Sequence, residues 1–371
     1  MAKQLSVTVV SGSPGNDGTR LVEQLIHQSS DVRLTAIVPK RSKKRNRSKG
    51  AVAVIPTTER LIQLGQGCSC CTVRADLMAK VQKIADEQSA EHILIHTTPH
   101  TDLRVLAKTF TVADQTGAVL SDVARIGSLV TVVDTATFIE TLEGPGARSL
   151  IERLELANVV LLEGASDASA QQLDQIGRSI GAINTGARVV RDDEGGPLLT
   201  SLYADQPFDL DLAEQRAAGA SEPNAASDSV VKFSYQARRP FHPARLHALL
   251  GEPWSGVIRA KGTFWVASRP EYACALDVAG MSRDISPEGM WWATVPLAQR
   301  PDSPQLQQYL ETIWHPEFGD RHQNLSIVGT EVDEEELRGR FEACLLTDEE
   351  VAAPDQWASM PDPFEWPANK S

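Results

Sequence analysis

Short apolar runs alternate with amphipathic stretches over the first 200 residues of the chain. The runs are rich in Val, Ile and Leu and occupy residues 7–10, 34–38, 51–55, 92–96, 129–134, 158–162 and 187–190. Stretches with helical periodicity, such as 19–29 and 73–88, lie between several of them. This order predicts an α/β fold, with a mostly parallel sheet covered by helices on both faces. Ligands are then expected at the carboxyl ends of the strands.

The pattern changes near residue 230, where strands and helices are no longer in regular alternation. It predicts strands at 230–237, 257–268, 272–278, 290–295 and 325–329, and helices at 242–251, 303–314 and 333–346. We expect a smaller α+β domain with its helices on one face. The expected domain organisation is therefore a first domain, a polar Ala/Ser-rich linker, a second domain and an extended tail, at residues 1–203, 204–229, 230–353 and 354–371.

Composition narrows the class of protein. The 371 residues are 42% hydrophobic and 23% charged, with a net charge of −13, and the pI is about 5.1. An acidic chain is a poor general binder of nucleic acid, which requires a basic surface. No apolar run approaches the ~20 residues of a membrane span, and the first residues do not form a signal peptide. We expect a cytoplasmic protein with no membrane partner. Residues 40–49 hold seven basic side chains, typical of a solvated loop or of a docking patch for an acidic partner or RNA.

The segment SGSPGNDGT follows the first apolar run, at the place where a phosphate-binding loop would lie. The pattern of such a loop is G-x-x-x-x-G-K-[ST]. Asp17 occupies the position of the second glycine and Gly18 that of the lysine, while Thr19 retains a hydroxyl for Mg²⁺. Gly12, Gly15, Gly18 and Thr19 are thus the candidate residues of a vestigial nucleotide site. No catalytic residue is predicted.

Three of the five cysteines, Cys68, Cys70 and Cys71, lie within four positions. Thiolates are soft ligands that suit Zn²⁺ or Cu⁺, and a helix start near Cys71 would favour the thiolate form. A closed structural zinc site has four ligands, so three cysteines predict an open or shared site. His96 and His100, at the end of the fourth main strand, are candidates for a further ligand. The alternatives are buried structural thiols and a redox switch.

These stretches together resemble the CobW family of P-loop GTPases, which are linked to zinc and cobalt handling and related to the nickel chaperone GTPases. GCSCCTVRADL, at residues 67–77, is similar almost letter for letter to the family signature G-C-x-C-C-T-x-R-x-D-L. Residues 7–25, 129–138 and 157–167 resemble the phosphate loop, a core strand and the guanine-reading segment. The second half looks like the CobW C-terminal domain of the subgroup associated with zinc limitation, in ARRPFHPARL, VIRAKGTFWVASRPE, WWATV and FGDRHQNLSIVG.

The chain departs from the family pattern at several separate places. The lysine that holds the phosphates is Gly18 here, and Asp17 adds a negative charge. The family's E-S-T-G segment is matched by residues 96–99, and its guanine-reading N-K-x-D by residues 163–166. A glutamate-bearing stretch that helps bind metal in relatives is replaced by residues 40–49. The resemblance thus implies a GTPase fold whose hydrolysis is weak or absent, and the departures argue against binding of GTP–Mg²⁺.

Three hypotheses follow from the sequence. The first is a zinc-binding, metallochaperone-like protein with a pseudo-GTPase domain, which serves a client metalloprotein. The second is an active GTP-hydrolysing metallochaperone with an atypical phosphate loop. The third is a regulatory partner that pairs with an active paralogue and binds no metal. A homo-oligomer is compatible with each of them.

Overall fold

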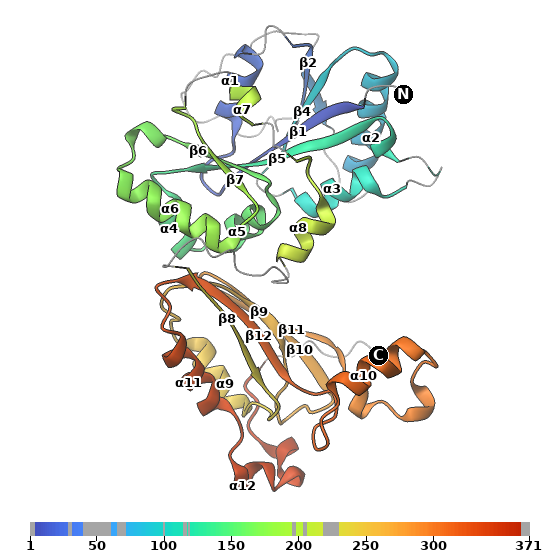
Figure 1. Ribbon diagram of the computed structural model, residues 1–371, viewed down its shortest axis with the longest axis vertical. Coiled ribbons are helices and arrows are strands. Elements are labelled where there is room, and N and C mark those ends of the chain that lie inside the picture. The colour runs from blue at the N-terminus through green and yellow to red at the C-terminus, as the bar shows by residue number, and fades with distance from the viewer. Residues whose placement is uncertain are drawn as a thin grey trace. The chain divides into compact units, whose positions relative to one another are not determined.

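The computed structural model divides the chain into two compact units (Figure 1). The first unit comprises Met1–Thr141 and Ser149–Ser221, and the second comprises Leu142–Arg148 and Glu222–Ser371. The structure describes residues 4–28, 32–39, 61–64, 72–98, 101–113, 117, 119–194, 198–202, 206–217 and 230–364.

The first unit contains a seven-stranded sheet in which every neighbouring pair is parallel. The strand order is β3-β2-β4-β1-β5-β6-β7. The strands are β1 Leu5–Gly12, β2 Leu34–Pro39, β3 Leu61–Leu64, β4 His92–His96, β5 Ala124–Asp134, β6 Val159–Glu163 and β7 Arg188–Arg191. The predicted parallel sheet is confirmed, and β1 lies near its centre with the loop that follows it at the carboxyl edge.

Apolar side chains cover both faces of this sheet. Val10 and Leu94 pack with Leu21 of the first helix on one face. Their neighbours along the strands, Val9 and Ile95, point to the other face and are fully buried. The helices are α1 Thr19–Gln28, α2 Thr72–Asp86, α3 Leu103–Thr111, α4 Phe138–Glu143, α5 Ala147–Leu156, α6 Ala170–Ile183, α7 Leu198–Ser201 and α8 Leu210–Ala217. Short 3-10 turns are η1 Leu120–Asp122 and η2 Ala165–Asp167.

The second unit contains a five-stranded antiparallel sheet with the order β11-β10-β9-β12-β8. Its strands are β8 Val230–Ala237, β9 Val257–Phe264, β10 Tyr272–Ala279, β11 Ser282–Met290 and β12 Gln323–Thr330. Its helices are α9 Pro243–Gly251, α10 Pro304–Ile313, α11 Glu334–Cys344 and α12 Asp348–Val351, with 3-10 turns η3 Trp292–Thr294, η4 Leu297–Gln299 and η5 Pro354–Ser359. Helices α9 and α11 pack on one face of this sheet. Phe341 of α11 lies in the same apolar core as Tyr235 and Phe241. The predicted α+β domain is confirmed.

The strand predicted at 290–295 is wrong. Strand β11 ends at Met290, and Trp292 begins the 3-10 turn η3. The carboxylate of Asp320 accepts hydrogen bonds from the backbone N–H groups of Trp292 and Ala293, both at 2.8 Å. This contact across the chain fixes a turn where the apolar residues alone indicated a strand.

The expectation of a linker over 204–229 fails in its first half, because Leu210–Ala217 forms helix α8. Leu210 and Ala213 are buried, and the N–H of Phe208 donates to the carbonyl of Gly127 at 3.0 Å. Apolar residues spaced along one helical face were sufficient to pack it. Residues 218–229, and the strand predicted at 51–55, lie outside the described residues.

The tail packs against the second unit as far as residue 364. It begins as the 3-10 turn η5 rather than as extended chain. Within it Trp357 is buried against Trp265, with ring centroids 6.1 Å apart, and Asp362 pairs with Arg269 at 3.0 Å.

Candidate functional site

The loop between β1 and α1 folds tightly back on the end of its own strand. The N–H of Asn16 donates to the carbonyl of Ser13 at 3.0 Å, which closes a turn. A Cβ on Gly12 would lie 2.2 Å from the carbonyl oxygen of Asn16 and 2.5 Å from Cα of Asp17. Only glycine allows this approach. The backbone of residues 16–17 therefore lies directly against Gly12.

The backbone N–H groups at the start of α1 are bonded to side chains of the same loop. The N–H of Gly18 donates to Oδ1 of Asn16, and the N–H of Thr19 donates to Oδ1 of Asp17, each at 3.0 Å. In a phosphate-binding loop such N–H groups point at the anion. Here Asp17 bonds the N–H two residues further on, as Asp commonly does in an Asx turn, and its charge lies at the start of the helix, where a phosphate would bind.

Two further strands hold the loop in place from the carboxyl edge of the sheet. His96, at the end of β4, donates from Nε2 to the carbonyl of Asp17 at 2.7 Å. Glu163, at the end of β6, accepts from Nδ2 of Asn16 at 2.6 Å and pairs with Arg20 at 3.6 Å. A carbonyl oxygen can only accept, so Nε2 of His96 carries the proton. The lone pair of a neutral His96 is then on Nδ1, which is the nitrogen left for a metal.

Carboxylates predominate where the strands end. Asp134 accepts from the N–H of Ala136 at 2.8 Å, and Asp192 accepts from Gly164 and Ala165 at 2.8 and 3.0 Å. The segment at 163–166, where guanine would be read, thus has two of its backbone donors occupied by Asp192. Together with Asp17 and Glu163, these side chains place negative charge along the edge at which P-loop proteins bind a polyphosphate.

Arg153 lies behind the loop and was not singled out by the sequence. It is buried in α5 and donates from Nη1 to the hydroxyl of Ser11 and from Nη2 to the carbonyl of Thr101 at 3.4 Å. Burial lowers the pKa of its guanidinium. A charged residue among the apolar positions of residues 147–156 was the one signal available.

Two family models match the chain. That of the CobW/HypB/UreG nucleotide-binding domain matches residues 6–191. That of the cobalamin synthesis protein cobW C-terminal domain matches residues 230–345. The chain belongs to the CobW family. The resemblance found in the sequence is thereby confirmed.

Curated relatives of this CobW-family protein carry names connected with zinc. A zinc-regulated GTPase metalloprotein activator 1 of Dictyostelium discoideum is 28% identical over 98% of this chain and 84% of its own length. A zinc chaperone of Mycobacterium tuberculosis is 26% identical over 83% of this chain and 80% of its own length. Among solved structures, the Zn(II)-bound YjiA GTPase from E. coli aligns at 14% identity with a TM-score of 0.39, over 93% of this chain and 100% of that one.

The predicted metal ligands are placed only in part. Cys68, Cys70, Cys71 and His100 lie outside the described residues, as does the basic run at 40–49. His96 is described, and its known partner is the loop carbonyl. Within the described ranges no group of three or more His, Cys, Asp or Glu side chains could hold a metal ion.

The two cysteines in the described part of this CobW-family protein belong to its second unit. Cys274 and Cys344 are free and buried, and burial raises their pKa to about 12 and about 11. Such thiols remain protonated and pack as small apolar side chains. They are structural and do not add to the metal hypothesis.

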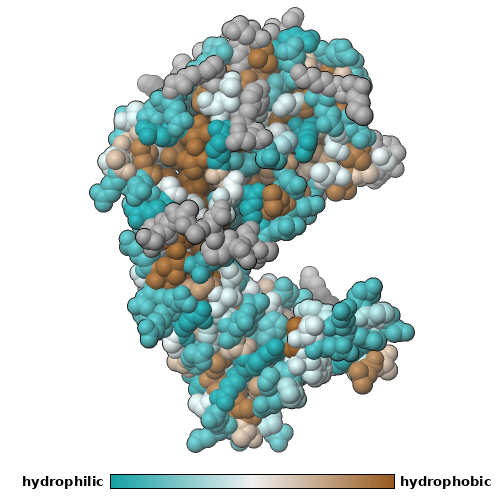
Figure 2. Space-filling model, viewed as in Figure 1, coloured by the Kyte–Doolittle hydropathy of each residue, from teal (hydrophilic) through white to brown (hydrophobic). Residues whose placement is uncertain are grey.

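The surface drawn in Figure 2 is mostly hydrophilic, with hydrophobic residues in separate patches. In the part of the chain that the structure describes, no helix is both long enough and apolar enough to cross a membrane.

Proposed function

We propose that this CobW-family protein is a zinc-binding, metallochaperone-like protein of the cytoplasm whose nucleotide site is vestigial. The observation that carries the nucleotide part is the state of the loop: the N–H groups of Gly18 and Thr19 are bonded to Asn16 and Asp17. A phosphate would have to displace two side chains and approach the Asp17 carboxylate without the lysine that normally offsets its charge.

The arrangement around the loop supports the same proposal. Glu163 and His96 hold Asn16 and the Asp17 carbonyl from two strands. Opening the loop for a nucleotide would break these contacts and also the hydrogen bonds of the Gly18 and Thr19 N–H groups. Phosphoryl transfer depends on positioning and charge neutralisation, and the described residues at this edge supply mainly negative charge.

The metal part rests on residue type and on the relatives. Cys68, Cys70 and Cys71 offer three soft ligands within four positions, and the curated relatives are named for zinc and for the activation of metalloproteins. Cytoplasmic thiols stay reduced and available for a metal. We infer that three thiolates leave one exchangeable position, as delivery to a client metalloprotein requires.

Calorimetric titration of the full chain with Zn²⁺ and, separately, with GTP–Mg²⁺ tests both parts. We expect one Zn²⁺ per chain with release of protons, because thiols must ionise to bind the metal. The double variant Cys68→Ser, Cys70→Ser should lose this binding, and Ser69→Ala in the same segment should retain it. We expect no saturable heat from GTP–Mg²⁺ and no GTP turnover above background.

The nucleotide part and the metal part of the proposal can be contradicted separately. GTP binding or turnover that disappears in Thr19→Ala would show a working nucleotide site and favour the active GTPase. Absence of zinc binding in the wild type would overturn the metallochaperone proposal, and a regulatory partner of an active paralogue would then be the better description.

A further inference from the structure

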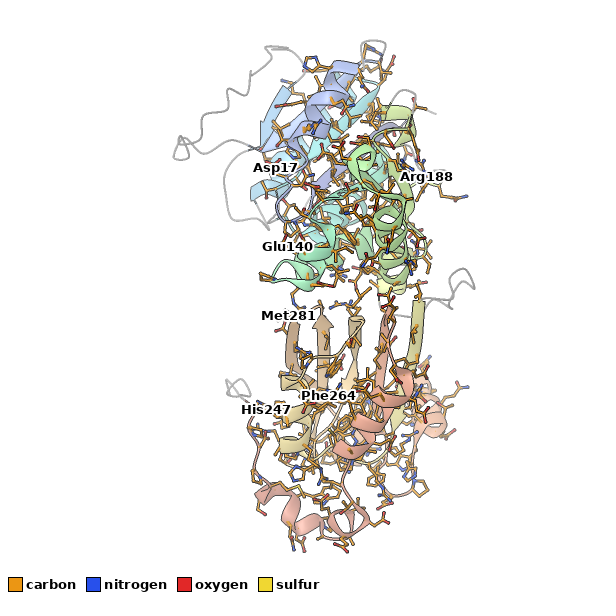
Figure 3. All side chains as sticks on the ribbon, turned by 90° about the vertical axis from the view of Figure 1, so that its left-hand side faces the viewer. Asp17, Glu140, Arg188, His247, Phe264 and Met281 are labelled. Atoms are coloured by element: carbon orange, nitrogen blue, oxygen red, sulfur yellow. The ribbon has the colours of Figure 1, made fainter. Side chains whose placement is uncertain are left out.

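A cavity of about 440 Å³ opens at the amino ends of β5, β6 and β7. This is the edge of the first unit's sheet opposite the phosphate-loop segment, and Asp17 and Arg188 lie on opposite sides of the unit in Figure 3. Three arginines line it, Arg125 at the start of β5, Arg188 at the start of β7 and Arg216 in α8. Its volume is in the range of small-molecule sites.

Arg125 supplies an uncommitted charge to this cavity. Its side chain is exposed, and its guanidinium makes no hydrogen bond or ion pair with any residue that the structure describes. A surface arginine with no acidic neighbour is ordinary by itself. Here it shares one concave site with two other arginines whose side chains are held in place.

Among the described contacts, a backbone carbonyl and an amide oxygen accept hydrogen bonds from the other two arginines. Arg188 donates from Nη2 to the carbonyl of Ser201 at 2.6 Å, and Arg216 donates from Nη1 to Oδ1 of Asn184 at 3.3 Å. The Arg216 guanidinium lies against Gly186, where a Cβ would be 2.0 Å from Nη1. An amide oxygen orients the Arg216 side chain without neutralising it, so its charge is available to a ligand.

The charge of the cavity lining is positive in an acidic protein. Asp209 is the carboxylate among the lining residues, and it accepts the N–H of Leu212 at 3.0 Å at the start of α8. The chain as a whole has a net charge of −13. Among the described residues that line this cavity, three arginines stand against one carboxylate, and this local excess of positive charge attracts anions.

A second cavity, of about 500 Å³, shares Arg125, Phe208 and Asp209 with the first. Its own lining includes the apolar side chains of Phe110 and Leu210. The two cavities together offer arginines for a charged head and aromatic walls for an apolar body, which is the usual division of a small-molecule site.

We propose that this amino-edge cavity binds a small organic ligand that carries an oxyanion, either phosphate or carboxylate. The planar guanidinium fork matches both groups with paired hydrogen bonds. The ligand would contact Arg125 and Arg216 through its oxyanion and Phe208 through its apolar part. The site is separate from the phosphate-loop segment, which lies at the opposite edge, and the proposal does not depend on the proposed zinc binding.

The test is calorimetric titration of the full chain with phenyl phosphate, with benzoate, and with benzamide as the neutral counterpart. We expect saturable binding of at least one anion and none of benzamide. The double variant Arg125→Gln, Arg216→Gln should weaken the anion by roughly tenfold or more, since charge-assisted hydrogen bonds are lost. Binding of phenyl phosphate alone would identify a phosphate ligand, and binding of benzoate alone a carboxylate ligand.

The control is Arg20→Gln, Arg191→Gln, which removes the same charge from side chains that do not line the cavity and should leave the affinity within about twofold, because salt screens charges outside the site. Equal weakening in both double variants would overturn the proposal, because net charge alone would then explain it. Absence of anion binding in the wild type would also overturn it. If the first double variant does not fold, Arg125→Gln alone carries the test, since that side chain has no described partner to lose.

Discussion

The two edges of the first unit's sheet differ in charge in a way that reverses the usual arrangement of its fold. At the carboxyl edge, Asp17 and Glu163 surround a loop whose N–H groups are already bonded. At the amino edge, Arg125, Arg188 and Arg216 line a cavity. Parallel α/β sheets normally bind anionic ligands at the carboxyl edge. From this difference we infer that side chains, and not strand order alone, determine which edge of such a sheet suits an anion.

The largest effect that we expect concerns the proposed zinc ligands. Substitution of Co²⁺ for Zn²⁺ should give a thiolate charge-transfer band in the near ultraviolet. Because Cys68 and Cys70 are two of the three proposed ligands, the double variant Cys68→Ser, Cys70→Ser should lose the band entirely. Cys344→Ser serves as a control, since that thiol is buried in the second unit, and should keep it. A wild type without the band would overturn the zinc proposal.

The next prediction concerns the pH dependence of stability, and it compares the histidines at the two ends of β4. His92, at the amino end, is buried against the hydroxyl of Thr8 at 3.0 Å, and burial lowers its pKa from 6.5 to about 4. The unfolded state therefore binds the proton first, so stability is lost as the pH falls from 6.5 towards 4. At about 1.4 kcal/mol per pKa unit, the loss is roughly 3 kcal/mol.

Hydrogen exchange of the β1 and β4 amides, measured from pH 7 to pH 4, reports this loss of stability. His92→Gln should remove most of the pH dependence in that window. His96→Gln, at the carboxyl end of the same strand, should leave it in place. The same dependence in the wild type and in His92→Gln would show that another group is responsible.

A matched pair of glycine variants tests how closely the loop is packed at the carboxyl edge. Gly12→Ala puts a methyl group 2.2 Å from the Asn16 carbonyl oxygen, and overpacking of this kind costs roughly 2–3 kcal/mol. Gly15 has a φ of +88°, but a Cβ there would have nothing within 4 Å, so Gly15→Ala should cost only about 1 kcal/mol. Denaturant unfolding measures both. Equal costs would mean that the loop does not lie against Gly12.

The smallest effect concerns an ion pair of the second unit, because solvent screens its side chains, which are 34% and 28% exposed. The hydrogen bonds from Arg245, at 2.6 and 3.1 Å, hold the pKa of Glu350 at about 2, below its usual 4.5. The stabilisation is present above pH 4.5 and is lost as the pH falls towards 2. Glu350→Gln should therefore lower the stability of this unit above pH 4.5, where the wild type has the full stabilisation, and flatten the loss of stability between pH 4.5 and 2. A change confined to pH 6.5–4.5 would contradict the assignment.

Much of the fold could be predicted because the signal was local. Strand β4 was predicted with its observed bounds, since the residues between its two histidines are apolar and buried. Strand β11 was missed because it lies at the edge of its sheet and most of its side chains are exposed, so that Ser282–Met290 shows no apolar alternation. The turn at Trp292 depends on Asp320, which is too distant in the sequence to be anticipated.

The candidate sites also contain features that one segment reveals and features that only the fold brings together. The replacement of the lysine by Gly18 and the charge of Asp17 were visible in the loop itself. The bond between Asn16 and Glu163 joins residues 147 positions apart, and only the strand order brings them together. The three arginines of the amino-edge cavity come from β5, β7 and α8, and each is unremarkable in its own segment. Sequence patterns detect chemistry within a segment and miss chemistry assembled across segments.

The close approach of residues 16–17 to Gly12 also bears on how such loops change during evolution. A mutation of Gly12 would be removed by selection because it disturbs folding, whether or not a nucleotide binds. Glycine would then persist at position 12 even in lineages that no longer hydrolyse GTP. In genome surveys, the glycines of this motif are therefore markers of shared ancestry, and the residue at position 18 is the one that reports on enzymatic activity.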